Sequence, residues 1–460
     1  MNKLIFTVIC IFMCSVLLAS ASYALECADI TNDITITCTG IDAKRITDNN
    51  IATHSAGENV KIEFKSEGPI EGLYIKYNKA PSKGSLDGKT DVATYGFLHE
   101  YIPLNSATSA VLTYQDTDIC DIQVFSKGTL PSYVQMWQNG NDNTDLLLCA
   151  THSDDDQLFF AGLLPYYAKV KNANVSVAYF INHYDTYNRT HELLDGLWHC
   201  GVKNYPEISH FPDGYSESSK EAEQFLKNKG FEYNDLITFQ KYLLEKYKPL
   251  VVVLHDFNGE YGHGAHMLNT KTFVEAYENA DEGDYIPEKV YVHLYGENKI
   301  ILPIDEPSEH LFGKTPFNVS QEAFGFHKSQ HWTWFYSWIY GKKNNITKSS
   351  QIAKYSPAEY GMYFSRVGDD AEKKDMFENV LTYSQREEIR KIEAEEIARL
   401  EKEQAEKEAV LKEMQLKQEA LKKQQIIQER NRKTTIAVSS IIIACIIVLT
   451  VIYIKHKKKR

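Results

Sequence analysis

Residues 435–454 form an uncharged apolar run, TIAVSSIIIACIIVLTVIYI, and this run restricts the fold of the chain more than any other feature. Twenty such residues in a helix span about 30 Å, which is the thickness of the hydrocarbon core of a bilayer. A basic tail follows, with positive charges at Lys455, Lys457, Lys458, Lys459 and Arg460. Because positively charged flanks stay on the cytosolic side, we expect a transmembrane helix over 435–454 and a cytosolic tail over 455–460.

The N-terminus predicts a signal peptide over residues 1–24. Lys3 precedes an apolar run that ends at Leu18, and small residues suitable for signal peptidase follow at 19–24. An uncleaved N-terminal anchor is the alternative. Together, the two ends predict a single-pass type I membrane protein whose main part lies in the lumen of the secretory pathway, the ER included, or outside the cell.

Sequons and cysteines are compatible with that oxidising compartment. N-glycosylation sequons occur at Asn174, Asn188, Asn318 and Asn345. Outside the two terminal apolar segments the chain has five cysteines, an odd number, so at least one is unpaired within the chain. We expect a disulfide among Cys27, Cys38 and Cys120, and buried thiols at Cys149 and Cys200.

The composition indicates a globular protein that does not bind nucleic acid. The chain has 460 residues, of which 43% are hydrophobic and 24% charged, so it is long enough for two domains and additional segments. The net charge is −12. Neutralising phosphates requires a surplus of Lys and Arg on one face, so the charge argues against polyanion binding.

Residues 25–133 predict a β-sandwich. Strand-like runs at 34–38, 60–64, 73–77, 110–114 and 120–125 are separated by clusters of Gly, Pro, Asn and Asp. Within this region, residues 46–53, 60–64 and 118–125 resemble the discoidin-like, galactose-binding-like modules. The resemblance implies binding of glycans or lipid surfaces through loops, and a purely structural sandwich is the alternative.

Residues 140–345 predict a Rossmann-like α/β domain. Continuous apolar strands are expected at 146–150, 175–181 and 249–254, with helices at 156–171, 190–198 and 236–247. Such strands belong to a parallel sheet that is covered on both faces, and ligands bind at the carboxyl ends of its strands.

Residues 384–433 predict a long charged helix, which a connecting segment, 346–383, joins to the α/β domain. Glu403 with Lys407 and Glu413 with Lys417 are two of its favourable i, i+4 pairs. The heptad seam is interrupted by polar residues. A lone helical stalk and a self-associating coiled coil therefore both remain open.

Two polar clusters follow two of the expected strands. Residues 151–156 (THSDDD) come directly after the strand 146–150, and residues 255–266 (HDFNGEYGHGAH) follow the strand 249–254. Imidazole and carboxylate groups are zinc ligands, and a second carboxylate beside a ligand stays free to accept a proton from water. Taken by itself, the first cluster has an alternative explanation, namely a surface histidine followed by acidic residues that cap the next helix. Two such clusters at two strand ends of one sheet favour a metal site.

The order of these motifs resembles the N-acetylglucosaminyl-phosphatidylinositol de-N-acetylase (PIG-L) family. Residues 150–156 (ATHSDDD) are similar to its AHPDDE signature, and residues 259–266 (GEYGHGAH) to its GEYGHxxH signature. Arg189 with Glu192, residues 200–202 and Asp213 are similar to its RxxE, LGV and D elements, and residues 327–330 (HKSQ) to its HxSQ element. The resemblance covers about 145–340.

The resemblance implies a zinc-dependent N-deacetylase and assigns the metal site. Its zinc ligands would be His152, Asp155 and His266, which leaves one coordination position for water. Asp154 would be the general base. The substrate is expected to be an N-acetylglucosamine-type glycan or glycolipid on the lumenal or extracellular side.

Other residues of the motifs would contact the substrate. His263 would stabilise the oxyanion or protonate the leaving amine, and Tyr261 occupies the place of a tyrosine that some members aim at the carbonyl. Arg189, Asp213 and His327 would bind substrate, although a structural ion pair is the alternative for Arg189 and Asp213.

Three positions depart from the family pattern. Ser153 replaces a proline, Asp156 replaces a glutamate, and Ala265 replaces the Asp or Asn that often stands beside the catalytic histidine. His263 would then lack its usual orienting acceptor. A non-catalytic, glycan-binding cell-surface protein that retains the deacetylase fold is therefore the second hypothesis.

Overall fold

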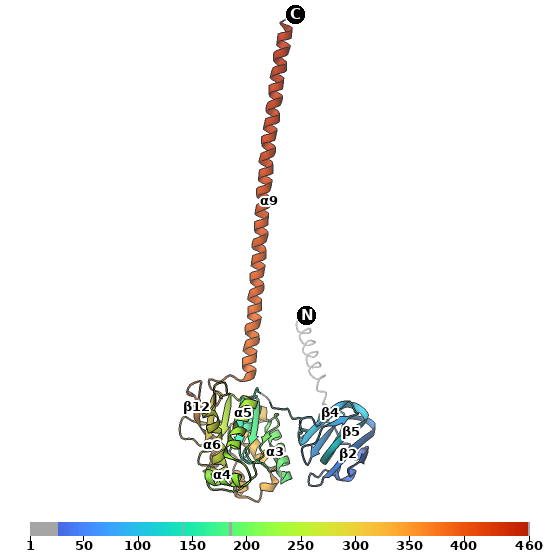
Figure 1. The fold of residues 1–460 in the computed structure, drawn as a ribbon, viewed down its shortest axis with the longest axis vertical. Helices are drawn as coiled ribbons and strands as arrows, with labels where there is room; N and C mark the ends of the chain where they lie inside the picture. The colour runs from blue at the N-terminus through green and yellow to red at the C-terminus, as the bar shows by residue number, and fades with distance from the viewer. Residues whose placement is uncertain (1–25, 141, 184–185, 459–460) are drawn as a thin grey trace, which may run out of the picture. The chain divides into compact units, whose positions relative to one another are not determined.

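The structure is a computed structural model, and it describes residues 26–140, 142–183 and 186–458. The predicted signal peptide and the last two residues of the basic tail lie outside the described residues. The chain divides into two compact units that meet between Tyr383 and Ser384. The first unit contains two β-sheets with their helices, and the second is part of one long helix (Figure 1).

The N-terminal region folds into a five-stranded sheet with the strand order β1-β2-β5-β3-β4. Two strands are long and bend, so that Tyr74 lies opposite both Tyr101 and Gln123. Val60, Ile62 and Phe64 alternate with more exposed residues, which buries one face of the sheet. The β structure predicted here is confirmed, while its division into the two sheets of a sandwich stays a prediction. The elements are η1 (Thr31–Asp33), β1 (Thr35–Thr39), η2 (Ala43–Arg45), β2 (Ser55–Tyr77), β3 (Gly84–Leu86), β4 (Thr90–Val92) and β5 (His99–Ser126).

A seven-stranded sheet follows, with the order β11-β12-β10-β9-β6-β7-β8. Five adjacent strands run parallel, as the continuous apolar segments predict, and β12 pairs antiparallel with β10 and β11. Residues 346–383, expected as a connecting segment, thus contribute a strand to this sheet. The strands are β6 (Leu146–Ala150), β7 (Val175–Tyr179), β8 (Glu207–Ile208), β9 (Val251–Leu254), β10 (Lys289–His293), β11 (Lys299–Ile301) and β12 (Glu359–Ser365).

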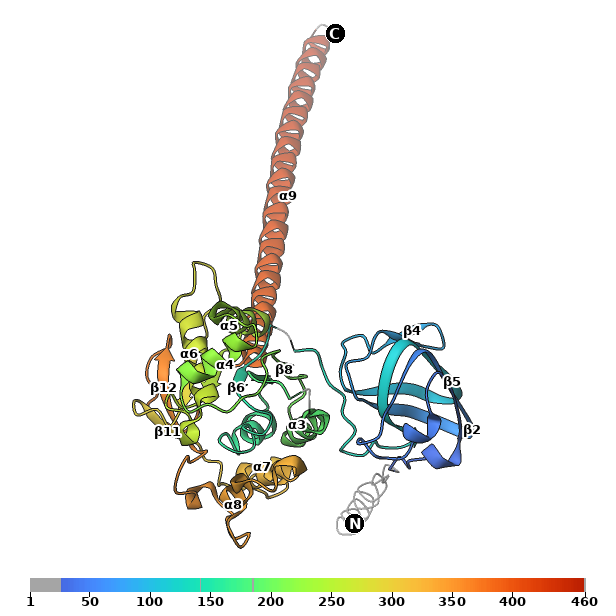
Figure 2. The same cartoon turned by 60° about the horizontal axis from the view of Figure 1, so that its bottom comes forward.

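Helices cover both faces of this sheet. Along β6, Leu146 and Leu148 pack into one apolar core, and Leu147 and Cys149 pack into another on the opposite face. The first core also contains residues of α2 (Leu163–Pro165), α3 (Tyr187–Cys200) and α7 (Pro316–Phe324), and the second contains residues of α5 (Tyr233–Tyr247) and α6 (Gly264–Glu278). Figure 2 shows α5 and α6 on one side of β6 and α7 on the other. Two further helices are α4 (Ser219–Asn228) and α8 (Trp334–Tyr340).

The segment after β6 is less helical than expected. Instead of a helix over 156–171, residues 153–162 form turns, and helical structure begins at Leu163. Gly162 has a φ of 89°, and a Cβ atom there would lie 2.8 Å from Ile304. A positive φ is incompatible with a continuous right-handed helix, so Gly162 separates the turns from the helical residues. The turns keep the acidic residues of the first motif at the end of β6.

The second unit belongs to α9 (Tyr383–Lys457), one helix of 75 residues that includes the predicted stalk and the apolar run. Ion pairs join Glu403 to Lys407 at 2.7 Å and Glu413 to Lys417 at 2.6 Å. Within the part of the chain that the structure describes, α9 is the one helix long and apolar enough to cross a membrane. A membrane anchor is thus compatible with the structure, and self-association of the stalk stays a prediction.

The predicted disulfide among Cys27, Cys38 and Cys120 does not form in the structure. All three thiols are free. Cys27 packs in a small cluster with Tyr74 and Phe125, whereas the Cys120 sulfur lies 3.9 Å from Nε2 of His191. Their side chains therefore have separate packing partners.

Candidate metal centre

Three predicted ligand atoms converge at the carboxyl ends of β6 and β9. Nδ1 of His152 lies 3.1 Å from Nε2 of His266, and Oδ2 of Asp155 lies 3.3 Å and 3.4 Å from these two nitrogens. All three side chains are buried. The first two residues follow β6, while His266 lies in the first turn of α6, after the loop that leaves β9.

This triangle has the dimensions of a zinc site. A tetrahedral zinc ion with bonds of about 2.0–2.1 Å places its ligand atoms about 3.3 Å apart. The three separations, 3.1–3.4 Å, agree with that value. Two imidazole nitrogens and one carboxylate oxygen are also a donor set typical of catalytic zinc, so these residues fit the ion that the sequence predicts.

Glu260 hydrogen-bonds the ring of His266 at Nδ1, the nitrogen that does not belong to the ligand triangle. It is fully buried, and its Oε2 lies 2.6 Å from Nδ1 of His266 and 2.7 Å from Nδ1 of His255, while its Oε1 lies 2.7 Å from Nδ1 of His293. Burial opposes ionisation of Glu260, but the three histidines, His255 foremost, hold its pKa well below the usual range. A carboxylate that accepts the Nδ1 proton of His266 leaves Nε2 of that ring free for a metal.

His255 is close to the triangle but has no nitrogen free for a metal. Its Nε2 lies 3.4 Å from Oδ2 of Asp155, yet it also accepts the backbone N–H of Thr151 at 3.1 Å. Its Nδ1 faces Glu260. With both nitrogens engaged, His255 supports the site rather than completing it.

The Asp155 carboxylate is fixed as an anion. Its Oδ2 accepts the backbone N–H groups of Thr151 and His152, at 3.2 Å and 2.7 Å. Burial raises the pKa of Asp155, but His266 and His152 outweigh that effect and hold it well below the usual range. An ionised carboxylate is the form that binds a cation.

Asp154 lies beside the triangle with one oxygen engaged and one without a partner. Arg189 donates from Nη2 to Oδ1 at 3.2 Å, and Oδ2 is buried without a hydrogen bond to any described residue. Burial raises the pKa of Asp154, and Arg189 opposes this effect. A buried oxygen of this kind requires a partner from whatever enters the site.

His263 is oriented by backbone rather than by a side chain. It is the N-cap of α6, and its Nδ1 accepts the backbone N–H of Ala265 at 3.2 Å. The proton of the neutral ring is therefore on Nε2. Burial lowers the pKa of His263 to about 3, and His152 and His266 add to the effect. The departure at Ala265 thus leaves His263 positioned, as a neutral hydrogen-bond donor.

A cavity of about 270 Å³ is lined by His152, Asp154 and Asp155. Its wall also includes Tyr261, which is half-buried and has a φ of 52°. A tyrosine with left-handed backbone dihedral angles is strained, and this conformation occurs where the surrounding structure imposes it. The remaining wall consists of Arg189, Asp213, Gly214, Tyr215, His263, Gln330 and Phe335.

The predicted substrate contacts separate into two groups. Arg189 and Asp213 line the cavity, and Asp213 Oδ1 lies 3.6 Å from Nε2 of His152. His327 is fully buried and does not belong to the described cavity wall, because its Nε2 hydrogen-bonds Oε1 of Gln157. Gln330, three residues later in the same motif, lines the cavity instead. The structure therefore offers Gln330 rather than His327 for contact with a ligand.

Sequence reasoning did not assign roles to Glu260, His255 and His293. His293 is the last residue of β10, far in sequence from both motifs, and only the parallel pairing of β9 with β10 brings it to the site. Glu260 stands between His255 and His266 in a single motif. An acidic residue between two metal-site histidines was the one available signal.

Comparisons with known proteins give matches among solved structures. No protein-family model matches the chain, and no curated protein matches its sequence. The matching structures include three that are similar to about half of it. They are the N,N'-diacetylchitobiose deacetylase of Pyrococcus horikoshii (14% identity, 48% of this chain and 84% of that one, TM-score 0.34), a deacetylase bound to teicoplanin (12%, 48% and 98%, 0.32) and the 4-carboxy-2-hydroxymuconate hydratase of Pseudomonas putida (15%, 50% and 99%, 0.31). TM-scores this low give no independent support, so the functional argument rests on the site.

Proposed function

We propose that the chain is a zinc-dependent hydrolase that removes the N-acetyl group from an N-acetylglucosamine-type glycan or glycolipid. One observation carries the proposal. Three ligand atoms form a triangle of zinc dimensions, and Asp154, a carboxylate with an unpartnered oxygen, lines the same cavity as two of the three ligand residues, His152 and Asp155. Metal binding alone requires no additional buried carboxylate of this kind.

The residues around the triangle account for hydrolysis of an amide. A zinc ion held by His152, Asp155 and His266 would polarise the acetamide carbonyl and acidify water. Asp154 accepts the proton of the attacking water on Oδ2, while Arg189 holds its Oδ1. The water oxygen bonds to the acetyl carbon, the C–N bond breaks, and the proton passes from Asp154 to the departing nitrogen. The second proton of the water passes from the acetic acid product to the amine, so the final products are acetate and the protonated amine.

His263 would act on the carbonyl oxygen rather than as an acid. Its Nδ1 is engaged with the backbone of Ala265, so Nε2 carries a proton that it can donate in a hydrogen bond. A neutral imidazole at a helix N-terminus is suited to polarising a carbonyl. This role does not require the Asp or Asn that Ala265 replaces.

The second candidate is a glycan-binding surface protein without catalysis, which would use the cavity lined by Arg189, Asp213 and Tyr215 to hold a sugar. The membrane-sized apolar run in α9 supports an anchored protein in either case. We further propose a type I topology, with the metal centre on the lumenal or extracellular side, and a discoidin-like glycan-binding role for the N-terminal sheet.

Two adjacent carboxylates provide the decisive test. In the full-length protein, Asp154→Asn is expected to retain one zinc per chain and to lose about 10²- to 10⁴-fold in acetate release, since proton transfer is worth that much. Asp155→Asn is expected to lose both metal and activity. Acetate release from a panel of N-acetylated sugars and metal analysis measure these effects, with the exposed Asp281→Asn as a matched control.

Contrary results would separate the two candidates. A wild-type protein that contains zinc and binds sugar, but releases no acetate from any sugar of the panel, favours the binding protein. If Asp154→Asn and Asp155→Asn both leave acetate release unchanged, the site is not the catalytic centre.

A further inference from the structure

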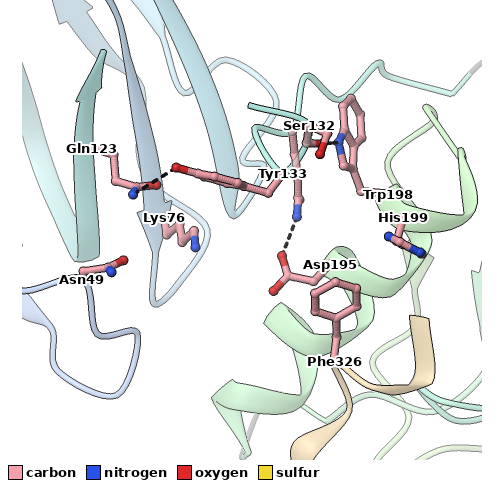
Figure 3. Close-up of a pocket in the computed structure, with 10 residues that line it drawn as sticks. Asn49, Lys76, Gln123, Ser132, Tyr133, Asp195, Trp198, His199 and Phe326 are labelled. Carbon is pink, nitrogen blue, oxygen red and sulfur yellow. Dashed lines mark hydrogen bonds between the residues drawn. The ribbon is translucent and has the colours of Figure 1, made fainter. Parts of the chain in front are cut away.

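A second cavity, of about 410 Å³, lies between the N-terminal sheet and α3 (Figure 3). Lys76 of β2 and Gln123 of β5 line one wall, and Asp195 and Trp198 of α3 line the other. Figure 3 shows Lys76 projecting from the sheet toward α3, where Asp195 lies. The wall thus combines groups from two regions that are far apart in the sequence.

The polar groups of this cavity are only partly satisfied. Gln123 is 8% exposed, and its Oε1 is buried without a partner among the described residues. Asp195 accepts a hydrogen bond from Gln135 at 2.6 Å on Oδ1. Within the described chain, Lys76 makes no ion pair shorter than 4.0 Å, although its charge acts on Asp195 from across the cavity. A carboxylate, an amide oxygen and an ammonium group therefore face a cavity that none of them fills.

Aromatic rings stand beside these polar groups. Tyr133 is 47% exposed and Phe326 38% exposed, and both line the cavity. The indole N–H of Trp198 donates to the backbone oxygen of Ser132 at 2.8 Å, which fixes that ring. Pockets that combine apolar rings with a few convergent polar groups are typical of small-ligand sites. A pyranose ring matches this lining, because its C–H faces pack on aromatic rings and its hydroxyls both donate and accept hydrogen bonds.

Two elements contribute to both this cavity and the metal-centre cavity. Helix α3 supplies Arg189 to the metal centre and Trp198 to the second cavity, about 14 Å further along the helix and about half a turn around it, so a ligand that contacts both passes around the helix. The segment 326–330 supplies Phe326 to the second cavity and Gln330 to the metal centre. Glu192 of α3 joins the two elements, since it accepts hydrogen bonds from the backbone N and from Oγ of Ser329, at 2.9 Å and 2.5 Å.

We propose that the second cavity binds a further sugar unit of the glycan whose acetamido group is presented to the metal centre. This proposal rests on the proposed function for the identity of its ligand. The substrate would then be an oligosaccharide, because a single sugar does not reach from Arg189 to Trp198. Asp195, Gln123 and Lys76 would bind the hydroxyl or acetamido groups of the second unit.

The experiment compares N-acetylglucosamine with its soluble trimer as probes of the full-length protein in detergent. Dissociation constants for both are measured on the Asp154→Asn variant, and KM values on the wild type. The trimer is expected to bind at least tenfold more tightly than the monomer. Lys76→Met and Asp195→Asn, each made in the Asp154→Asn background for the binding assay, are expected to reduce that preference by about tenfold, since each removes a charged hydrogen-bonding group. Lys61→Met, an exposed position on the same strand, is expected to leave the preference unchanged.

The binding assay separates failure of this proposal from failure of the proposed function. If no acetate is released but the trimer preference exists and depends on Lys76 and Asp195, the second site stands and the catalytic assignment falls. A trimer that binds no more tightly than the monomer overturns the second site, whatever the activity. So does a trimer preference that both variants retain.

Discussion

Oε2 of Glu260 lies 2.6 Å from Nδ1 of His266, and the same carboxylate group contacts His255 and His293 at 2.7 Å. A single buried anion thus fixes the ring orientation of three histidines. Of these, His266 supplies an atom of the ligand triangle, whereas Nε2 of His255 lies 3.4 Å from Asp155 but accepts the backbone N–H of Thr151. The geometry of the candidate metal centre therefore depends on a residue that is not itself a predicted ligand.

Glu260→Gln is expected to lower zinc affinity by about 10- to 100-fold, which is the usual cost of losing a carboxylate behind a metal-bound histidine. In the glutamine variant, one carboxylate oxygen is replaced by an NH2 group, which donates hydrogen bonds and does not accept them. The side chain can therefore no longer accept hydrogen bonds from all three histidine rings. Competition with a chelator of known affinity measures the effect. Glu282→Gln, an exposed change in the same region of the chain, serves as the control. Equal zinc affinity for Glu260→Gln and wild type would show that Glu260 does not orient His266.

The sequence predicts the parallel sheet and the two polar motifs at the ends of its strands, because both depend on local patterns. Leu146–Ala150 and Val251–Leu254 are continuous apolar strands, and the polar residues that follow them necessarily meet at one edge of a parallel sheet. The resemblance of the two motifs to those of the PIG-L family, rather than the strand pattern, implies His152, Asp155 and His266 as ligands, and the structure places their ligand atoms 3.1–3.4 Å apart.

Features that depend on distant pairings are not predictable in this way. The role of His293 depends on the placement of β10 beside β9, and the strand β12 depends on pairing with β10 across nearly seventy residues. His327 matches its motif, yet its side chain is directed to Gln157 by packing that the motif does not encode. The second cavity requires two regions to pack together, so no sequence pattern indicates it.

His263→Ala is expected to retain zinc and to reduce acetate release by about 10²- to 10³-fold, the effect of removing one hydrogen-bond donor to a developing oxyanion. The ring contributes Nε2–H to the cavity, and its Nδ1 is engaged with Ala265. Metal analysis and kcat for a released-acetate assay are measured together. The exposed His310→Ala is the control. Loss of zinc in His263→Ala would instead make His263 a ligand.

Asp195 is expected to make the stability of the protein depend on pH. Burial raises the pKa of Asp195 to about 6, against the opposing effects of Lys76 and Gln135, from a usual value of 3.8. Between these values the native state binds more protons than the unfolded state, so stability decreases as pH rises from about 4 to about 6. Asp195→Asn removes this pH dependence. The Tm of the variant, relative to wild type, is therefore expected to be higher at about pH 7 than at about pH 4.5.

Thermal unfolding of the full-length chain at both pH values measures this difference. Asp116→Asn replaces an exposed carboxylate of β5 and is the matched control. The same difference in Tm at both pH values would show that Asp195 has its usual pKa in the folded protein.

The four sequons are expected to differ in use, because their side chains differ in exposure, and at Asn188 the side-chain oxygen is buried. Asn345 is exposed, whereas Asn174 donates from Nδ2 to the backbone oxygen of Asn143 at 2.7 Å, and Asn318 donates from Nδ2 to that of Thr347 at 3.0 Å. A glycan on Nδ2 of either engaged residue would break these contacts.

On the proposed lumenal topology, Asn345→Gln and Thr347→Ala should therefore both remove most of the mobility shift that an N-glycosidase abolishes, while Asn174→Gln should not. A shift that persists in both Asn345→Gln and Thr347→Ala would place the glycan elsewhere. Absence of any shift in the wild-type protein from a glycosylating cell would argue against the lumenal placement of the metal centre.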